Sequence, residues 1–188
     1  ELTPKSPPSK IQNGNSPVFY KDGIRFLFSK GGQIYESTMD INYTPKLLFS
    51  VRGSNGNPAF SPDGNEILFT SDRGDHGFIG IYNTIRRVIR WVAPDVSNDS
   101  YPVWAPDGKR IAFIRVAGTK AGELSNLTGG VKFSIWIADT ETLKAKMIWK
   151  SPADDGGFSQ YSTNKALDWT STGRILFFSE HSGWNHLY

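Results

Sequence analysis

One short phrase recurs along the chain, each time ending at a glycine. It reads SPVFYKDG at residues 16–23, NPAFSPDG at 57–64, YPVWAPDG at 101–108 and ALDWTSTG at 166–173. A repeat of this kind indicates one supersecondary unit stacked several times. An aromatic residue precedes each glycine by four positions, an apolar residue follows by three, and Phe follows by five. In chain order these are Phe19, Phe60, Trp104 and Trp169, then Phe26, Ile67, Ile111 and Leu176, then Phe28, Phe69, Phe113 and Phe178.

The spacing of the repeat predicts the architecture. The four glycines, Gly23, Gly64, Gly108 and Gly173, are 41, 44 and 65 residues apart. A four-stranded β-propeller blade takes about 40–50 residues, so the first two intervals each match one blade. The third interval is longer, and we expect the excess in two loops rich in Gly, Ser, Thr and Asn, at residues 117–130 and 151–164.

Within each copy, the S-P-D-G turn leads into a strand with three successive apolar residues, such as Ile67, Leu68 and Phe69. Such a strand is buried on both faces, as in a sheet packed between two others. Aliphatic-aromatic pairs predict third strands at Ile34-Tyr35, Ile81-Tyr82, Ile135-Trp136 and Leu187-Tyr188. Fourth strands are expected at 46–50, 88–92 and 146–150.

The predicted fold class is therefore all-β, a β-propeller with about four four-stranded blades, the last incomplete. We expect an N-terminal extension at residues 1–15 and blades at about 16–56, 57–100, 101–164 and 165–188. Known propellers have about four to eight blades, so the chain is interpreted as a fragment of a larger ring. Its open blade edges would permit self-association.

Composition excludes several classes of protein. The chain has no Cys, which excludes disulfides and thiolate metal sites. Its net charge of +3 is spread out, so no nucleic-acid partner is expected. No stretch approaches 18 apolar residues, and no membrane span is expected.

No catalytic motif is found in the sequence. A serine hydrolase with a nucleophile elbow needs G-x-S-x-G, and the nearest approach, at residues 157–161, reads GFSQY. His76, His181 and His186 have no evident nucleophile partner or metal-binding pattern. We therefore expect no catalytic, cofactor-binding or metal-binding residues, no cofactor, and no enzymatic activity of this chain itself.

The repeat x-P-x-[FW]-S-P-D-G-x-x-I-x-F resembles that of TolB and of the propellers of prolyl oligopeptidase-family serine peptidases. The C-terminal stretch ILFFSEHSGWNHLY, at residues 175–188, is similar to a phrase S-E-x-x-G-W-x-H-L-Y of the dipeptidyl peptidase IV branch. It departs at His181, where that branch commonly has Arg followed by Asp. The resemblance makes Glu180, His181, Trp184 and His186 candidate interaction residues. The branch's acidic pair that binds the substrate amine is not assigned to Asp154-Asp155, because the flanking pattern differs.

The resemblance implies a non-catalytic propeller that gates and selects peptide substrates for a hydrolase domain of the same exported serine peptidase. The alternative is a TolB-like periplasmic propeller that binds a protein partner; a third hypothesis is a carbohydrate-associated surface propeller. The first two place the chain outside the cytoplasm. They predict, as partners, either a hydrolase domain of the same longer chain, with peptide substrates, or another protein.

Overall fold

The computed structural model describes residues 10–117, 132–152 and 166–188, which form strands joined by turns and loops. Both loops expected to hold the excess residues lie largely outside the described residues. The first blade contains β1 Asn15–Phe19, β2 Arg25–Lys30, β3 Gln33–Thr38 and β4 Lys46–Phe49. The second contains β5 Ser54–Phe60, β6 Glu66–Asp72, β7 Gly77–Asn83 and β8 Val88–Trp91. The third contains β9 Asn98–Trp104, β10 Arg110–Val116, β11 Phe133–Asp139 and β12 Ala145–Lys150. The fourth contains β13 Leu167–Trp169, β14 Ile175–Ser179 and β15 His186–Leu187.

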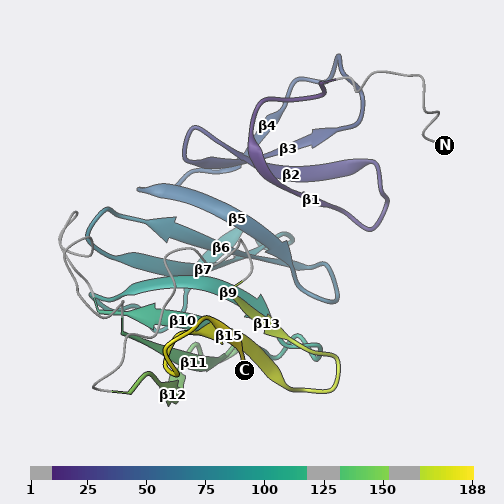
Figure 1. Ribbon diagram of the computed structural model, residues 1–188. Coiled ribbons are helices and arrows are strands. Elements are labelled where there is room, and N and C mark those ends of the chain that lie inside the picture. The colour runs from purple at the N-terminus through teal and green to yellow at the C-terminus, as the bar shows by residue number, and fades with distance from the viewer. Residues whose placement is uncertain (1–9, 118–131, 153–165) are drawn as a thin grey trace.

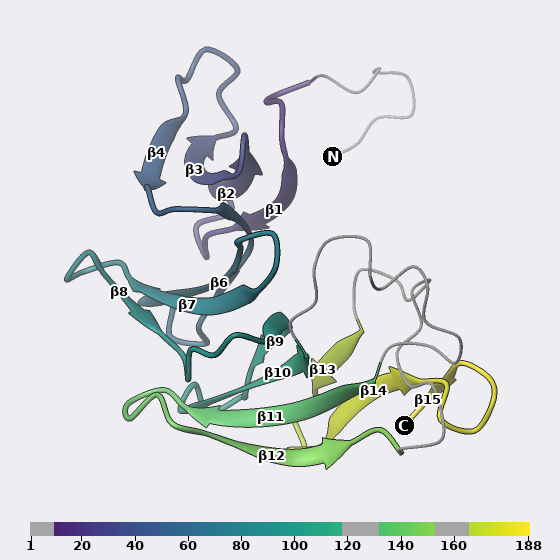
Figure 2. The same cartoon turned by 90° about the vertical axis from the view of Figure 1, so that its left-hand side faces the viewer.

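Each blade is an antiparallel sheet whose strands pair in chain order, from the inner strand outward. The blades follow one another along an arc, from the purple first blade to the yellow fourth blade in Figure 1. The quarter turn of Figure 2 shows the first blade standing apart from the fourth. A parallel bridge between Gly77 and Asn98 links the second and third blades. The chain is therefore an open run of propeller blades, which confirms the predicted fold class.

The S-P-D-G turn acts through its Asp and its Gly. The side chain of Asp63 accepts a hydrogen bond from the Asn65 backbone N–H at 3.1 Å, and Asp107 accepts one from the Lys109 N–H at 2.9 Å. The Ser61 hydroxyl, followed by the Asn65 N–H, lowers the pKa of the Asp63 carboxyl, and the Lys109 N–H lowers the pKa of the Asp107 carboxyl. The glycine at the end of the turn has a positive φ in all four copies, from 68° to 84°. Glycine adopts this backbone conformation without steric cost, which explains why the phrase ends on it.

A β-bulge at the X-Pro dipeptide marks the inner strand of the first three blades. Ser16 and Pro17 lie together opposite Phe28 in the β1–β2 pairing, so β1 carries one extra residue there. The same bulge places Asn57-Pro58 opposite Phe69 and Tyr101-Pro102 opposite Phe113. The recurrent proline and the recurrent Phe of the sequence repeat therefore belong to one local structure.

Apolar clusters between consecutive blades hold the arc together. Phe69 of the second blade is fully buried, and its ring lies 4.8 Å from that of Phe49 in the first blade. Its neighbours in the cluster include Leu27 and Ile34, both fully buried. The clusters between the second and third blades, and between the third and fourth, are built in the same way. The three-residue apolar runs of β2, β6 and β10 are buried, as predicted for sheets covered on both faces.

The fourth blade departs from the sequence alignment by one residue. Its turn is shorter, because Thr170 N–H bonds to the carbonyl of Arg174, one residue after the glycine; the equivalent Ser61 bonds to Glu66, two residues after it. Consequently Trp169 pairs with Ile175, as Phe60 pairs with Ile67. The expected equivalence of Leu176 and Phe178 with the apolar residues of the other copies is wrong. Ile175 and Phe177 occupy those positions instead.

The contacts of Phe177 support this correction. Its ring lies 4.8 Å from that of Trp149 in the outer strand of the third blade, the same relation that joins Phe69 to Phe49. Residues alternate between the two faces of a strand, so Phe178 lies on the opposite face of β14. The fourth copy also has Leu167 in place of proline. It pairs directly with Phe177 in the register of β13 and β14, without the bulge.

Apolar side chains are exposed at both ends of the arc. In the first blade, Phe19 is 50% and Ile24 60% exposed; in the fourth, Trp184 is 77% exposed. Gly14 lies directly over the ring of Phe28, where a larger residue would clash, so the segment before β1 covers part of the first blade. Among the described residues, no helix is long and apolar enough to cross a membrane.

The corrected register predicts unequal effects of two neighbouring substitutions. Phe177→Ala removes a ring packed between the third and fourth blades and should lower the free energy of unfolding by about 2–4 kcal/mol. Phe178→Ala, the matched control on the other face, should cost less than about 1 kcal/mol. Urea denaturation followed by tryptophan fluorescence measures both. Equal losses, or a larger loss for Phe178→Ala, would restore the alignment expected from the sequence.

Candidate functional site

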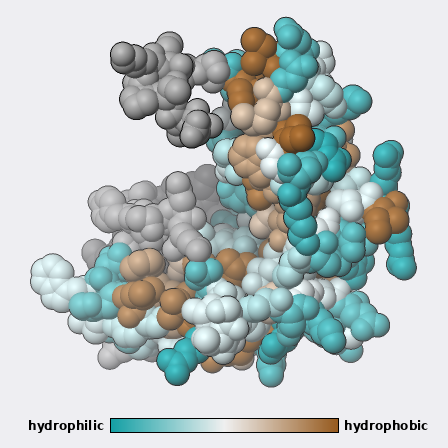
Figure 3. All heavy atoms as spheres, turned by 90° about the vertical axis from the view of Figure 1, so that its right-hand side faces the viewer, coloured by the Kyte–Doolittle hydropathy of each residue, from teal (hydrophilic) through white to brown (hydrophobic). Residues whose placement is uncertain are grey.

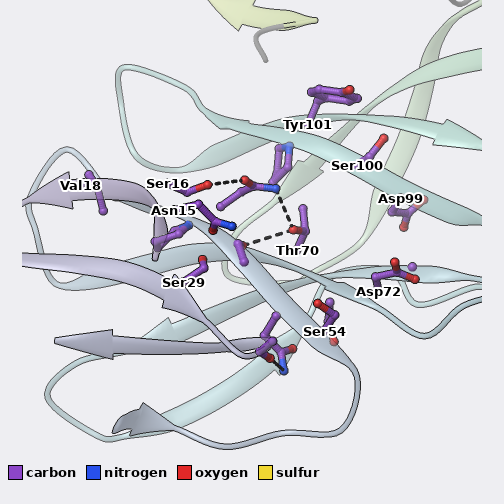
Figure 4. Close-up of a pocket in the computed structure, with 18 of the residues that line it drawn as sticks. Asn15, Ser16, Val18, Ser29, Ser54, Thr70, Asp72, Asp99, Ser100 and Tyr101 are labelled. Carbon is purple, nitrogen blue, oxygen red and sulfur yellow. Dashed lines mark hydrogen bonds between the residues drawn. The ribbon is translucent and has the colours of Figure 1, made fainter. Parts of the chain in front are cut away.

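Residues of the first three blades, together with Leu167 of the fourth, line a large cavity of about 1490 Å³. In the space-filling view, the surface is hollowed between the first blade and the later ones (Figure 3). The close-up in Figure 4 shows side chains from β1, β2, β5, β6 and β9 around this space. Most of the lining side chains are hydroxyls and amides, including Asn15, Ser16, Ser54, Asn57, Thr70, Asn98, Ser100 and Tyr101. We call this space the channel.

A chain of hydrogen bonds crosses from the first blade to the second along the channel wall (Figure 4). The Ser16 hydroxyl donates to Asn57 Oδ1 at 3.0 Å, and Asn57 Nδ2 donates to the Thr70 hydroxyl at 3.3 Å. The Thr70 hydroxyl in turn donates to the Gly56 carbonyl at 3.2 Å. These bonds fix the direction of the Asn57 amide, which lies exposed at the channel.

The bulge residues of this wall have an unusual backbone. Ser16, Asn57 and Tyr101 have φ values of 50°, 52° and 50°, in the left-handed region. Non-glycine residues adopt this region rarely, although Asn tolerates it best. The three residues stand at the same position of three successive blades, immediately before proline. Residues before proline normally adopt extended conformations, so the surrounding blade imposes this geometry.

One buried ion pair supports the channel wall in the third blade. Asp99 and Arg115 form two hydrogen bonds, from Nε to Oδ1 at 2.7 Å and from Nη2 to Oδ2 at 2.8 Å. Arg115 also donates to the Ala93 carbonyl and lies over the ring of Trp136, 4.7 Å from its centre. Burial raises the pKa of the Asp99 carboxyl, and the Arg115 guanidinium acts against that rise. The pair leaves this part of the channel wall close to neutral.

Removing the carboxylate of this pair should be costly. Asp99→Asn removes the buried counterion of Arg115 and leaves it only the half-exposed Asp95, and we expect a loss of about 3–5 kcal/mol in the free energy of unfolding. Asp95→Asn is the control, because Asp95 is about half exposed and lies 3.4 Å from the same guanidinium. It should cost at most about 1 kcal/mol. Similar losses for the two variants in chemical denaturation would show that the bidentate pair does not stabilise this wall.

The left-handed backbone at Asn57 makes a second prediction. Asn57→Val places a β-branched residue at φ 52° and should destabilise the fold by about 1–3 kcal/mol. Asn57→Gly removes the same amide from a position that suits glycine, and its stability should stay within about 1 kcal/mol of the parent. Thermal and urea unfolding of both variants test this. A Gly variant as unstable as the Val variant would contradict the backbone argument.

The candidate residues from the C-terminal phrase lie elsewhere, around β15. The His181 ring lies 4.2 Å from that of Tyr188 and 5.8 Å from that of Trp149, and its Nδ1 lies 3.0 Å from the Ser179 hydroxyl. The His186 ring stands edge-to-face to that of Tyr188, with 6.4 Å between ring centres. The structure thus brings the two histidines to one tyrosine. Trp184 is highly exposed, and neither it nor Glu180 lines the channel.

Metal ligands and charged side chains are the groups that could carry chemistry in this structure. In the described ranges 10–117, 132–152 and 166–188, no group of three His, Asp or Glu side chains is arranged to hold a metal ion. The channel wall there carries hydroxyl and amide groups, with Lys30, Asp72 and the paired Asp99 as its charged side chains. Such a wall can donate and accept hydrogen bonds along a polar ligand.

Known proteins share this architecture. TolB from Acinetobacter baumannii superposes with a TM-score of 0.57 at 22% identity, covering 95% of this chain and 40% of that one. Dipeptidyl peptidase 4 from Porphyromonas gingivalis gives a TM-score of 0.63 at 15% identity, covering 92% and 30%. The chain has a TolB-like propeller fold. It resembles both TolB propellers and the propellers of dipeptidyl peptidase 4-type enzymes, as the repeat predicted.

Sequence comparison adds one curated relative. The Tol-Pal system protein TolB from Anaeromyxobacter sp. (strain K) is 31% identical over 110 residues, which is 58% of this chain and 22% of that protein. No family model matches the chain. The TolB-like propeller thus spans about a fifth of this curated relative and less than half of the Acinetobacter TolB chain.

Sequence reasoning did not identify the channel residues. Its candidates came from a phrase that lies at the edge of the fourth blade, whereas the channel is lined by residues near the start of each inner strand. One signal was available: the residue before proline varies as Ser16, Asn57 and Tyr101 inside an otherwise repeated phrase. Within a repeat, positions that vary while their surroundings persist are good candidates for ligand contacts.

Proposed function

We propose that this TolB-like propeller is a non-catalytic domain of an exported serine peptidase of the dipeptidyl peptidase IV type. Its role would be to admit and select peptide substrates for a hydrolase domain. The observation that carries the proposal is the channel, whose wall is rich in hydroxyl and amide groups that can exchange hydrogen bonds with a peptide. The C-terminal phrase at residues 179–188 and the similarity to the Porphyromonas enzyme add support.

Active-site labelling of two proteins tests this function. A fluorophosphonate probe should label the longer protein that contains this propeller, and that protein should cleave an Xaa-Pro dipeptide substrate. The 188-residue chain alone should remain unlabelled. Labelling of the short chain, or no labelling of the longer protein, would overturn the proposal. Titrated enzyme of known activity serves as the positive control.

A second candidate function is favoured by the curated sequence relative, which is a TolB. The propeller would then bind a protein partner in the bacterial periplasm, and no hydrolase would be attached. In that case the longer protein would stay unlabelled, while the immobilised chain would retain a specific protein from an envelope extract. The exposed Phe19, Ile24 and Trp184 offer contacts to neighbouring blades or to a second copy under either function.

A further inference from the structure

We propose that Arg73 and the aromatic rings beside it form a docking surface for an acidic segment of a partner polypeptide. The surface comprises Arg73, His76, Phe78 and Trp91, at the end of the second blade where the chain passes from β6 to β7. We call it the arginine-aromatic surface. These four residues are not among those that line the channel. Recognition here is therefore separate from the proposed function of the channel and compatible with both candidate functions.

Stacking and one hydrogen bond hold the Arg73 guanidinium in place. Its Cζ lies 5.5 Å from the ring centre of Phe78 and 5.5 Å from that of Trp91. Its Nε donates to the hydroxyl of the buried Ser71 at 3.2 Å. The backbone of Gly53 passes so close that an added Cβ would lie 2.7 Å from Arg73 Cδ. A side chain fixed in this way loses little further freedom when a ligand binds.

Arg73 differs from the other ring-stacked arginines in having no counterion among the described residues. Four arginines stack on aromatic rings there: Arg25, Arg73, Arg110 and Arg115. Three of them have a carboxylate partner, which is Asp22 at 2.7 Å for Arg25, Asp107 at 2.9 Å for Arg110 and Asp99 at 2.7 Å for Arg115. Within the described part of the chain, no carboxylate pairs with Arg73.

The carboxylates closest to Arg73 in the chain are engaged within their own loop. Asp72 Oδ1 accepts a hydrogen bond from the Gly74 N–H at 2.7 Å, and Asp75 Oδ1 lies 2.6 Å from His76 Nδ1. The Nη1 and Nη2 groups of Arg73 make no hydrogen bond to any described residue. Both can therefore donate to the two oxygens of one external carboxylate.

The third blade shows what a ring-stacked arginine binds when a carboxylate is within reach. Arg115 lies 4.7 Å from the ring centre of Trp136 and donates through two nitrogens to both oxygens of Asp99. That pair is buried, whereas Arg73 is partly exposed. The second blade thus offers to the outside the arrangement that the third blade completes internally.

The rings around Arg73 favour a polypeptide over a small carboxylate. Phe78 and Trp91 are partly exposed with their rings 5.8 Å apart, and the His76 ring stands edge-on to that of Phe78 at 4.9 Å. Trp91 also packs against the apolar cluster between the first and second blades, which makes it a rigid support. Trp and Arg carry much of the binding energy in protein interfaces. A small carboxylate would gain only one partly exposed ion pair, which is weak.

NMR titration of the ¹⁵N-labelled chain tests the arginine-aromatic surface. Two pentapeptides are compared, one with a single Glu between two Phe residues and one with Gln in place of that Glu. The Glu peptide should shift the signals of the Trp91 indole N–H and the Arg73 Nε–H. It should bind at least about fivefold more tightly than the Gln peptide. Arg73→Gln should abolish this preference, and Arg73→Lys should keep only part of it, because an ammonium group lacks the planar fork.

The matched control is Arg110→Gln. Arg110 also stacks on a ring, that of Trp169, but it already pairs with Asp107, so this variant should keep the full preference for the Glu peptide. Equal affinity of the parent chain for the two peptides would overturn the inference, and this comparison needs no variant to fold. A preference that persists in Arg73→Gln with a native-like spectrum would overturn it too. Glutarate binding as tightly as the Glu peptide would overturn the choice of a polypeptide.

Discussion

The packing of one recurrent Phe between neighbouring blades is the contact on which the rest of this structure depends. Phe69 fills the space between the first and second blades against Phe49, and Phe177 fills the corresponding space against Trp149. Phe69 and Phe177 each belong to the second strand of a blade. In the first three blades, the X-Pro bulge of the inner strand lies opposite the Phe of the second strand. The Phe that packs between blades and the bulge residues that line the channel therefore belong to the same pair of strands.

Much of the fold follows from the sequence because the repeat specifies it several times. The turn glycines, the buried second strands and the aliphatic-aromatic third strands could be placed from their spacing alone, since each depends on local geometry that recurs. For the fourth copy, the spacing predicted the wrong residues, one position too late in the second strand. Alignment on Gly173 assumed turns of equal length, but the turn before Ile175 is one residue shorter. A one-residue slip moves every side chain of a strand to the other face, so Phe178 could not replace Phe177 in the core.

The channel was less predictable than the fold for a physical reason. Proline disfavours helical backbone at the residue before it and promotes extended structure, so the sequence around Asn57 and Tyr101 does not indicate a positive φ. The packing of complete blades holds both residues at a positive φ, and no local sequence pattern indicates this strained backbone. The C-terminal phrase, in contrast, could be found in the sequence because it is similar to a phrase of the dipeptidyl peptidase IV branch. Its His181 and His186 meet at Tyr188 on the outside of the fourth blade, away from the channel wall.

Stability and recognition place different demands on the same repeat. The Phe that packs between blades must stay constant, because each interface needs a ring of that size at that place. The residue before proline meets a weaker constraint, because the bulge sets its backbone and the residue lines the channel. Ser16 and Asn57 line the channel, Tyr101 both lines it and packs against the cluster between the third and fourth blades, and Ala166 is fully buried within that cluster. The same position of the repeat thus passes from the channel wall to the core along the chain, while the interfaces between blades keep the same apolar arrangement.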